Sequence, residues 1–67
     1  MFSARNQLKG TIKSVKLGGV MAEVILAVGN VEVVSIITRE SAERMKLKAG
    51  DTAAAVIKAT AVMILKE

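Results

Sequence analysis

The stretch VMAEVILAVGNVEVVSIIT, residues 20–38, decides the fold that this sequence predicts. Two apolar runs, residues 20–28 and 31–38, flank the pair Gly29-Asn30. Glycine at the first position of a two-residue loop is what a type II′ hairpin turn requires, so we expect two antiparallel strands joined by this turn. The second run is almost entirely apolar, which predicts that both faces of its strand are covered.

A further strand is predicted before the hairpin, over residues 7–17. Apolar and polar residues alternate there, which is typical of a half-buried strand. The apolar positions change phase between Ile12 and Val15. A β-bulge near Lys13-Ser14 would account for this change, since a bulge inserts one extra residue and bends the strand.

The spacing of the apolar residues changes after the predicted hairpin. Residues 38–47 carry spaced apolar positions among charged residues, with Thr38 suited to the N-cap and Gly50 to the C-terminal stop of a short helix. Residues 52–59 and 61–67 then predict two more strands.

The predicted order of elements is three strands, a short helix and two strands. This order is the pattern of an all-β, five-stranded, OB-like Greek-key barrel with one short helix. We expect residues 1–67 to form a single domain of this kind, because a chain of 67 residues is one domain at most.

The composition predicts that this domain is oligomeric. Apolar residues make up 52% of the chain, yet so small a domain buries only about 60% of the surface that its unfolded chain exposes. The chain has no Cys and no His, so disulfides and the usual soft ligands of a structural metal are missing. Subunit association is the remaining means of stabilisation, and we expect an obligate homo-oligomer.

The location expected from the sequence is the cytoplasm. No apolar signal-peptide region follows the start, and no apolar run reaches the length of about 18 residues that a membrane span needs. We therefore expect no membrane partner. The absence of cysteine also fits a reducing compartment.

Enzymatic activity is not expected. The chain offers no His base, no Cys nucleophile, no close pair of carboxylates and no phosphate-binding glycine loop, so no catalytic residue and no direct metal ligand is predicted. An OB-like nucleic-acid-binding module is an alternative, because the net charge is +4. Single-stranded nucleic acid is bound on aromatic platforms, however, and Phe2 is the only aromatic residue. A purely structural oligomerisation domain is the third hypothesis.

A small oxyanion fits the residues better than nucleic acid does. Hydroxyl, ammonium, guanidinium and backbone N–H donors that could bind one occur in three places: Ser3 to Asn6 with Arg5, Thr38 to Ser41 at the start of the predicted helix, and Lys58. Arg5 has no acid nearby, since the first acid of the chain is Glu23. Plain helix capping would also explain Thr38 and Ser41, and a surface lysine would explain Lys58.

The ordered set of short motifs SARN, IIT-x-x-S, LKAGD, VIKAT and VMI resembles the molbindins, the Mop-type molybdenum-pterin-binding domains. The resemblance spans the chain from Ser3 to Lys66. It implies an OB-like barrel that assembles as a hexamer, a trimer of dimers. It further implies that molybdate or tungstate binds at subunit interfaces and that the protein serves intracellular molybdenum storage and homeostasis, with no other cofactor.

The same resemblance implies a set of oxyanion-binding residues. Its Ser-x-Arg motif falls on Ser3 and Arg5, and its lysine falls on Lys58. Ala59 stands where relatives can have serine, so only its backbone N–H could contribute. Two further ligands, Thr38 and Ser41, are expected from the neighbouring subunit.

Overall fold

The computed structural model describes residues 5–67 of the chain. Its elements are, in order, β1 (Asn6–Leu17), β2 (Met21–Val28), β3 (Val31–Thr38), α1 (Arg39–Arg44), β4 (Thr52–Ile57) and a 3₁₀ turn, η1 (Ala59–Ala61). Within these described residues, no helix is long and apolar enough to cross a membrane.

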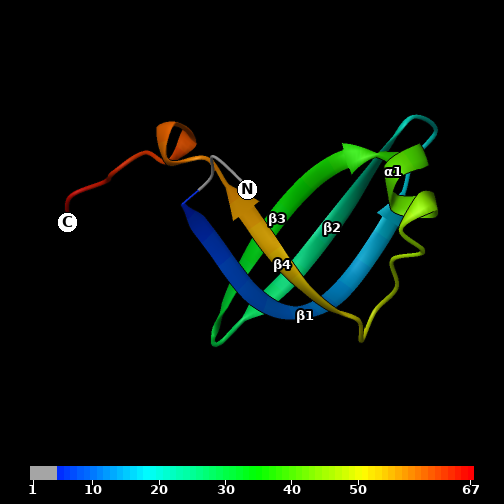
Figure 1. Cartoon of the computed structure of the whole chain (residues 1–67), viewed down its shortest axis with the longest axis horizontal. Coiled ribbons are helices and arrows are strands. Elements are labelled where there is room, and N and C mark those ends of the chain that lie inside the picture. The colour runs from blue at the N-terminus through cyan, green and yellow to red at the C-terminus, as the bar shows by residue number, and fades with distance from the viewer. Residues whose placement is uncertain (1–4) are drawn as a thin grey trace.

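The four strands form one antiparallel sheet in the order β3-β2-β1-β4. Strand β1 is long and bent, and Figure 1 shows it curving beneath the other strands. Its first half pairs with β4, and its second half pairs with β2. The register against β2 shifts between Ile12 and Ser14, which confirms the predicted bulge. A Cβ at Gly10 would lie 2.1 Å from the Ala27 carbonyl oxygen, so glycine allows β1 and β2 to cross closely.

The hairpin between β2 and β3 is confirmed. Val28 pairs with Val31 across the turn, and Gly29 has a φ of +60° whereas Asn30 has none in the positive range, as a type II′ turn requires. The expectation that both faces of β3 are covered is wrong for the single chain. Val34 and Ile36 each keep 58% of their surface exposed, because the face of β3 that they share is not covered by other described residues.

The core lies on the inner, concave face of the curved sheet. Its buried centre is Ile12 from β1 with Val24 and Leu26 from β2. Half-buried residues of β3, β4 and the segment after α1 pack against this centre: Val33, Ile37, Leu47, Ala53 and Ala55. These side chains are small or aliphatic, so the interior is filled by many modest contacts.

Helix α1 starts as predicted and ends earlier. Thr38 is its N-cap. At the other end, Lys46 has a φ of 53°, its N–H donates to the Glu43 carbonyl (3.1 Å), and the Leu47 N–H donates to the Ala42 carbonyl (3.2 Å). This is the Schellman arrangement that ends many helices, with Lys46 in the left-handed position.

The expectation that Gly50 stops the helix is therefore wrong. Gly50 has a φ of +96° in a later turn, and its N–H donates to the Ile12 carbonyl at 2.8 Å. Its conformational freedom serves the return of the chain toward β4. A glycine near a helix end indicates a left-handed residue but does not say which turn uses it.

The fifth strand, predicted over residues 61–67, is not formed. Strand β4 ends at Ile57 instead of at residue 59, and η1 then turns the chain away from the sheet. Residues 62–67 lie exposed in the tail that projects from the molecule in Figure 1. A strand needs the backbone of a neighbour, and the tail has none there. The sheet is accordingly an open four-stranded version of the expected barrel.

Candidate functional site

Arg5 and Lys58 lie at the same end of the sheet. The register of β1 against β4 pairs Asn6 with Ile57, so the residues that flank this pair on each strand are neighbours across the ladder. Arg5 precedes Asn6 and Lys58 follows Ile57, and both side chains belong to exposed residues. The fold thus brings together two basic groups that are 53 positions apart in the sequence.

Four acids of the described chain are paired with other basic residues. The ion pairs of the structure join Lys13 to Glu32, Arg39 to Glu43, Arg44 to Glu40, and Lys48 to Asp51. Arg5 and Lys58 take part in none of these pairs. Two cations without a neighbouring carboxylate attract an anion, and the forked guanidinium of Arg5 suits a multi-oxygen anion in particular.

The segment after β4 adds backbone donors at this end. Lys58 is extended and precedes η1, whose turn is closed by the Ala61 N–H donating to the Lys58 carbonyl at 2.9 Å. The first N–H groups of a helical turn have no acceptor within the turn, which makes the Ala59 N–H a candidate donor to a ligand. Lys58 thus lies just beyond the strand in which the sequence placed it.

Thr38 and Ser41 form a capping pair at the start of α1. The Ser41 N–H donates to Thr38 Oγ1 at 3.1 Å, and the Thr38 hydroxyl donates to Ser41 Oγ at 2.9 Å. Plain capping, the alternative raised by the sequence, is therefore present. The proton of the Ser41 hydroxyl is not used in this pair, so Ser41 keeps one donor for another group.

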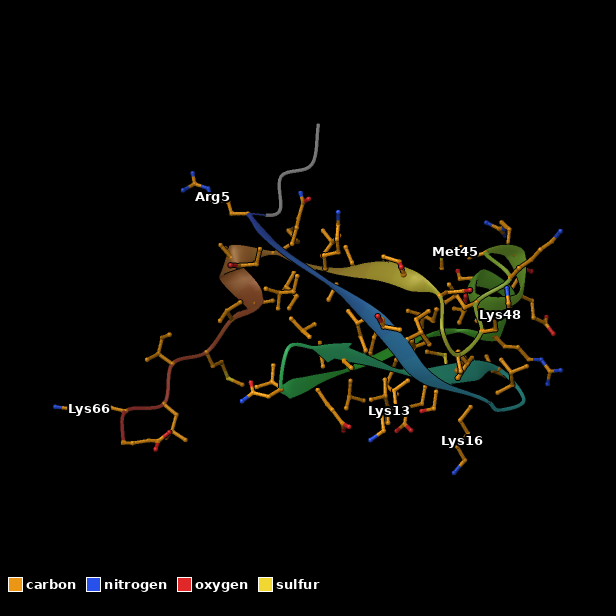
Figure 2. All side chains as sticks on the ribbon, turned by 90° about the horizontal axis from the view of Figure 1, so that it is seen from below. Arg5, Lys13, Lys16, Met45, Lys48 and Lys66 are labelled. Carbon is orange, nitrogen blue, oxygen red and sulfur yellow. The ribbon has the colours of Figure 1, made fainter. Side chains whose placement is uncertain are left out.

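The two donor groups lie at opposite ends of one subunit. In Figure 1 the tail and the start of β1 are at one side, and α1 is at the other. Figure 2 shows the same separation, with Arg5 far from Met45, the C-cap residue of α1. One chain therefore brings Arg5 and Lys58 together but does not bring Thr38 and Ser41 to them.

Ser3, the remaining candidate, lies outside the described residues. Asn6, the last residue of the predicted donor cluster Ser3 to Asn6, starts β1 at this end. The fold adds Thr60, an exposed hydroxyl of η1 whose signal in the sequence was its adjacency to Lys58.

A cavity of about 420 Å³ lies between β1 and α1 and is lined in part by Lys13, Ser14 and Lys48. Both lysines are paired with carboxylates, so this hollow lacks the free positive charge of the Arg5 end. Among residues 5–67 there is also no group of three carboxylates that could hold a metal ion.

The curved antiparallel sheet with one short helix and a basic end defines a small OB-like β-domain. Comparison with known families makes the assignment narrower. Residues 3–64 match the model of the TOBE domain, and the chain is 53% identical over 64 residues to molybdenum-pterin-binding protein 3 of Clostridium pasteurianum, covering 94% of each chain. The chain therefore belongs to the TOBE domain family, among its Mop-type molybdenum-pterin-binding proteins.

Solved structures agree with this assignment. A molybdate-binding protein from Sporomusa ovata is 36% identical, superposes with a TM-score of 0.95 and is matched over 98% of both chains. The cytoplasmic molybdate-binding protein ModG, solved with molybdate bound, is 47% identical with a TM-score of 0.83. That match covers 88% of this chain and 43% of the ModG chain. The resemblance seen in the sequence and the OB-like fold class are both confirmed.

Proposed function

We propose that this chain binds molybdate at sites shared between the subunits of a homo-oligomer. The observation that carries the proposal is the pairing of Asn6 with Ile57, which sets the unpaired cations Arg5 and Lys58 side by side. The Sporomusa and ModG relatives are molybdate-binding proteins, and they share the fold over most of this chain. The relatives are binding proteins, so we expect binding without catalysis.

The donor set explains why molybdate would be preferred. Molybdate at neutral pH is a fully deprotonated dianion that only accepts hydrogen bonds, and Arg5, Lys58 and the Ala59 N–H only donate. Phosphate retains a proton at this pH and would require an acceptor, yet Arg5 and Lys58 have no ion-pair partner among the described residues. Sulfate matches the charge but is smaller, so donors spaced for molybdate would lie too far from its oxygens. Tungstate has the charge and nearly the size of molybdate and should bind as well.

The assembly follows from the separation of the donors. Thr38 and Ser41 belong to the end of the molecule opposite to Arg5, so they would complete a site only on a neighbouring subunit. We propose Ser3, Arg5, Lys58 and the Ala59 N–H from one subunit with Thr38 and Ser41 from the next. A hexamer built as a trimer of dimers, acting as a cytoplasmic molybdenum store, is the form that the family resemblance supports.

Calorimetric titration of the chain with molybdate, sulfate and phosphate tests this proposal. We expect saturable binding of molybdate, weaker binding of sulfate and the weakest binding of phosphate. Similar affinities for all three anions would reduce the Arg5 end to a diffuse basic surface and would contradict the proposal. Absence of binding by any oxyanion would instead favour a purely structural oligomerisation domain.

A further inference from the structure

Arg39, the first residue of α1, connects the start of this helix to the turn between β1 and β2. Its backbone N–H donates to the Val20 carbonyl at 2.7 Å, and its guanidinium Nη1 donates to the Gly18 carbonyl at 3.0 Å. Figure 1 shows this turn, in cyan, beside α1. One residue therefore holds the start of the helix at two points, once through its backbone and once through its side chain.

The turn that accepts these bonds is itself fixed to the sheet. The Gly18 N–H donates to the Met21 carbonyl at 2.8 Å, and Met21 pairs with Thr38 in the ladder between β2 and β3. The strands thus set the position of the carbonyl that the Arg39 guanidinium binds. The bond from Arg39 therefore ties α1 to the sheet.

Helix α1 is too short to keep its orientation without such a bond. It has six residues, of which only Ala42 is buried. An isolated helix of this length is unstable in water, because the first turn is costly to form. Among the described residues, Arg39 is the one side chain of α1 that donates a hydrogen bond outside the helix. The orientation of the helix on the sheet therefore depends on Arg39.

The second arginine of α1 provides a contrast. Arg44 donates to Glu40 at 2.8 Å, and Arg39 donates to Glu43 at 3.2 Å, so each arginine forms an ion pair within the helix. Only Arg39 adds a bond to the turn between β1 and β2. The two residues therefore share a charge and a type of ion pair and differ in the bond to Gly18.

We infer that Arg39 is a positioning residue for molybdate binding. It follows Thr38 and precedes Ser41, the capping pair proposed to supply two hydroxyl ligands to the site of a neighbouring subunit. Its bonds to Gly18 and Val20 fix the direction in which α1 presents the Ser41 hydroxyl. Donors that are held in place before a ligand arrives bind it more tightly, because less ordering accompanies binding. The inference rests on the proposed function and assigns Arg39 no contact with the anion.

Calorimetric titration of Arg39→Met with molybdate tests this inference. Methionine retains an unbranched side chain but cannot donate to Gly18, and it should weaken molybdate binding by about 3–10-fold. Two matched variants should stay within about twofold of the wild type: Arg44→Met, which removes the same charge, and Glu43→Gln, which removes only the ion pair within the helix. Equal affinities of Arg39→Met and Arg44→Met would overturn the inference.

The salt dependence of binding separates positioning from charge. Salt screens the attraction between an arginine and an anion, but it does not correct the position of a hydroxyl. The ratio of the wild-type affinity to the Arg39→Met affinity should therefore be the same at low salt and at about 0.5 M NaCl. A ratio that falls to about one at the higher salt concentration would show that Arg39 acts through its charge and would overturn the inference.

Amide hydrogen exchange in the anion-free protein measures the position of the helix start without a ligand. The Ser41 N–H, bonded to Thr38 Oγ1, should exchange about 3–10-fold faster in Arg39→Met than in Arg44→Met, because the helix start opens more often. Amides of the ladder between β1 and β2 should exchange at wild-type rates, which controls for folding. Arg39→Gln gives the same test should Arg39→Met not fold.

The outcomes distinguish the inference from the proposed function. Wild-type binding of molybdate that Arg39→Met leaves unchanged, or unchanged exchange of the Ser41 N–H in the folded variant, would overturn the inference alone. Wild-type protein that binds no molybdate would overturn the proposed function and the inference together.

Discussion

The two ends of this molecule carry basic residues in different ways. At the helix end, Arg39, Arg44 and Lys48 pair with Glu43, Glu40 and Asp51 at 3.2, 2.8 and 3.3 Å. At the opposite end, Arg5 and Lys58 flank the paired ends of the neighbouring strands β1 and β4 and form no ion pair among the described residues. Three basic residues at the helix end are thus paired with acids, whereas Arg5 and Lys58 are not.

This difference separates structural charges from ligand-binding charges. An exposed ion pair contributes only about 0–1 kcal/mol to stability, so the pairs around α1 solubilise and modestly support a short helix. Unpaired cations that are held together by a strand register repel each other slightly and gain from an anion between them. A basic residue near the N-terminus therefore indicates anion binding where the fold places no acid beside it.

Removal of either unpaired cation should have the largest effect on binding. We expect Arg5→Ala and Lys58→Ala each to weaken molybdate binding by about 1.5–3 kcal/mol, roughly 10–150-fold, as for a lost hydrogen bond to a charged group. Calorimetric titration measures this change. The free energy of unfolding of the protein without anion should stay nearly constant, since neither side chain has a partner to lose.

The matched control for these variants is Arg44→Ala at the helix end. Arg44 is paired with Glu40, so its removal should leave the molybdate affinity within about twofold. A loss of affinity as large as that of Arg5→Ala would mean that net charge, and not the Arg5 end, determines binding.

Stability at the helix end should depend on the capping pair. Thr38→Ala removes the acceptor of the Ser41 N–H and should lower the free energy of unfolding by about 1 kcal/mol. Thr38→Ser keeps a hydroxyl at the same place and should retain most of that stability. Chemical denaturation of both variants measures the difference, and equal losses would show that the methyl group of Thr38 matters more than its hydroxyl.

The left-handed residue after α1 should give the smallest effect, and of opposite sign. Lys46 has a φ of 53°, a conformation that costs a residue with a side chain about 1 kcal/mol. Lys46→Gly should therefore stabilise the fold by about 0.5–1 kcal/mol, whereas Lys46→Ala should not. Thermal unfolding at a fixed protein concentration compares the stability of the two variants. An equal increase in stability for Lys46→Ala and Lys46→Gly would contradict the claim that the left-handed conformation destabilises a residue with a side chain.

The sequence predicted the elements whose cause is local. Gly29 predicted the hairpin, and the change of phase of the apolar residues after Ile12 predicted the bulge. Both elements were confirmed. The end of α1 was missed because the sequence points to glycine for the left-handed position, yet Lys46 occupies it. Gly50 is instead used in the turn that returns the chain to Ile12.

The tail was missed for a different reason. Residues 61–67 have the composition of a buried strand, but a strand is defined by its neighbour, and the single chain does not supply one there. The same limit applies to the candidate site. The resemblance to a known family pointed to Arg5 and Lys58 as candidate ligands. Only the register of Asn6 against Ile57 shows that the two residues lie at the same end of the sheet. Thr38 and Ser41 remain a proposal, because their place in the site requires a second subunit.

Complementation between two defective chains tests the shared site most directly. Arg5→Ala and Ser41→Ala should each bind molybdate poorly, since every site of either homo-oligomer lacks one ligand. After the two variants are unfolded, mixed and refolded, a mixed two-fold pair has one site with both defects and one site with neither. Calorimetric titration of the mixture should recover a fraction of sites with wild-type affinity. Mixed oligomers that contain no such sites would contradict the account, because a site completed within one chain could not be rebuilt by mixing.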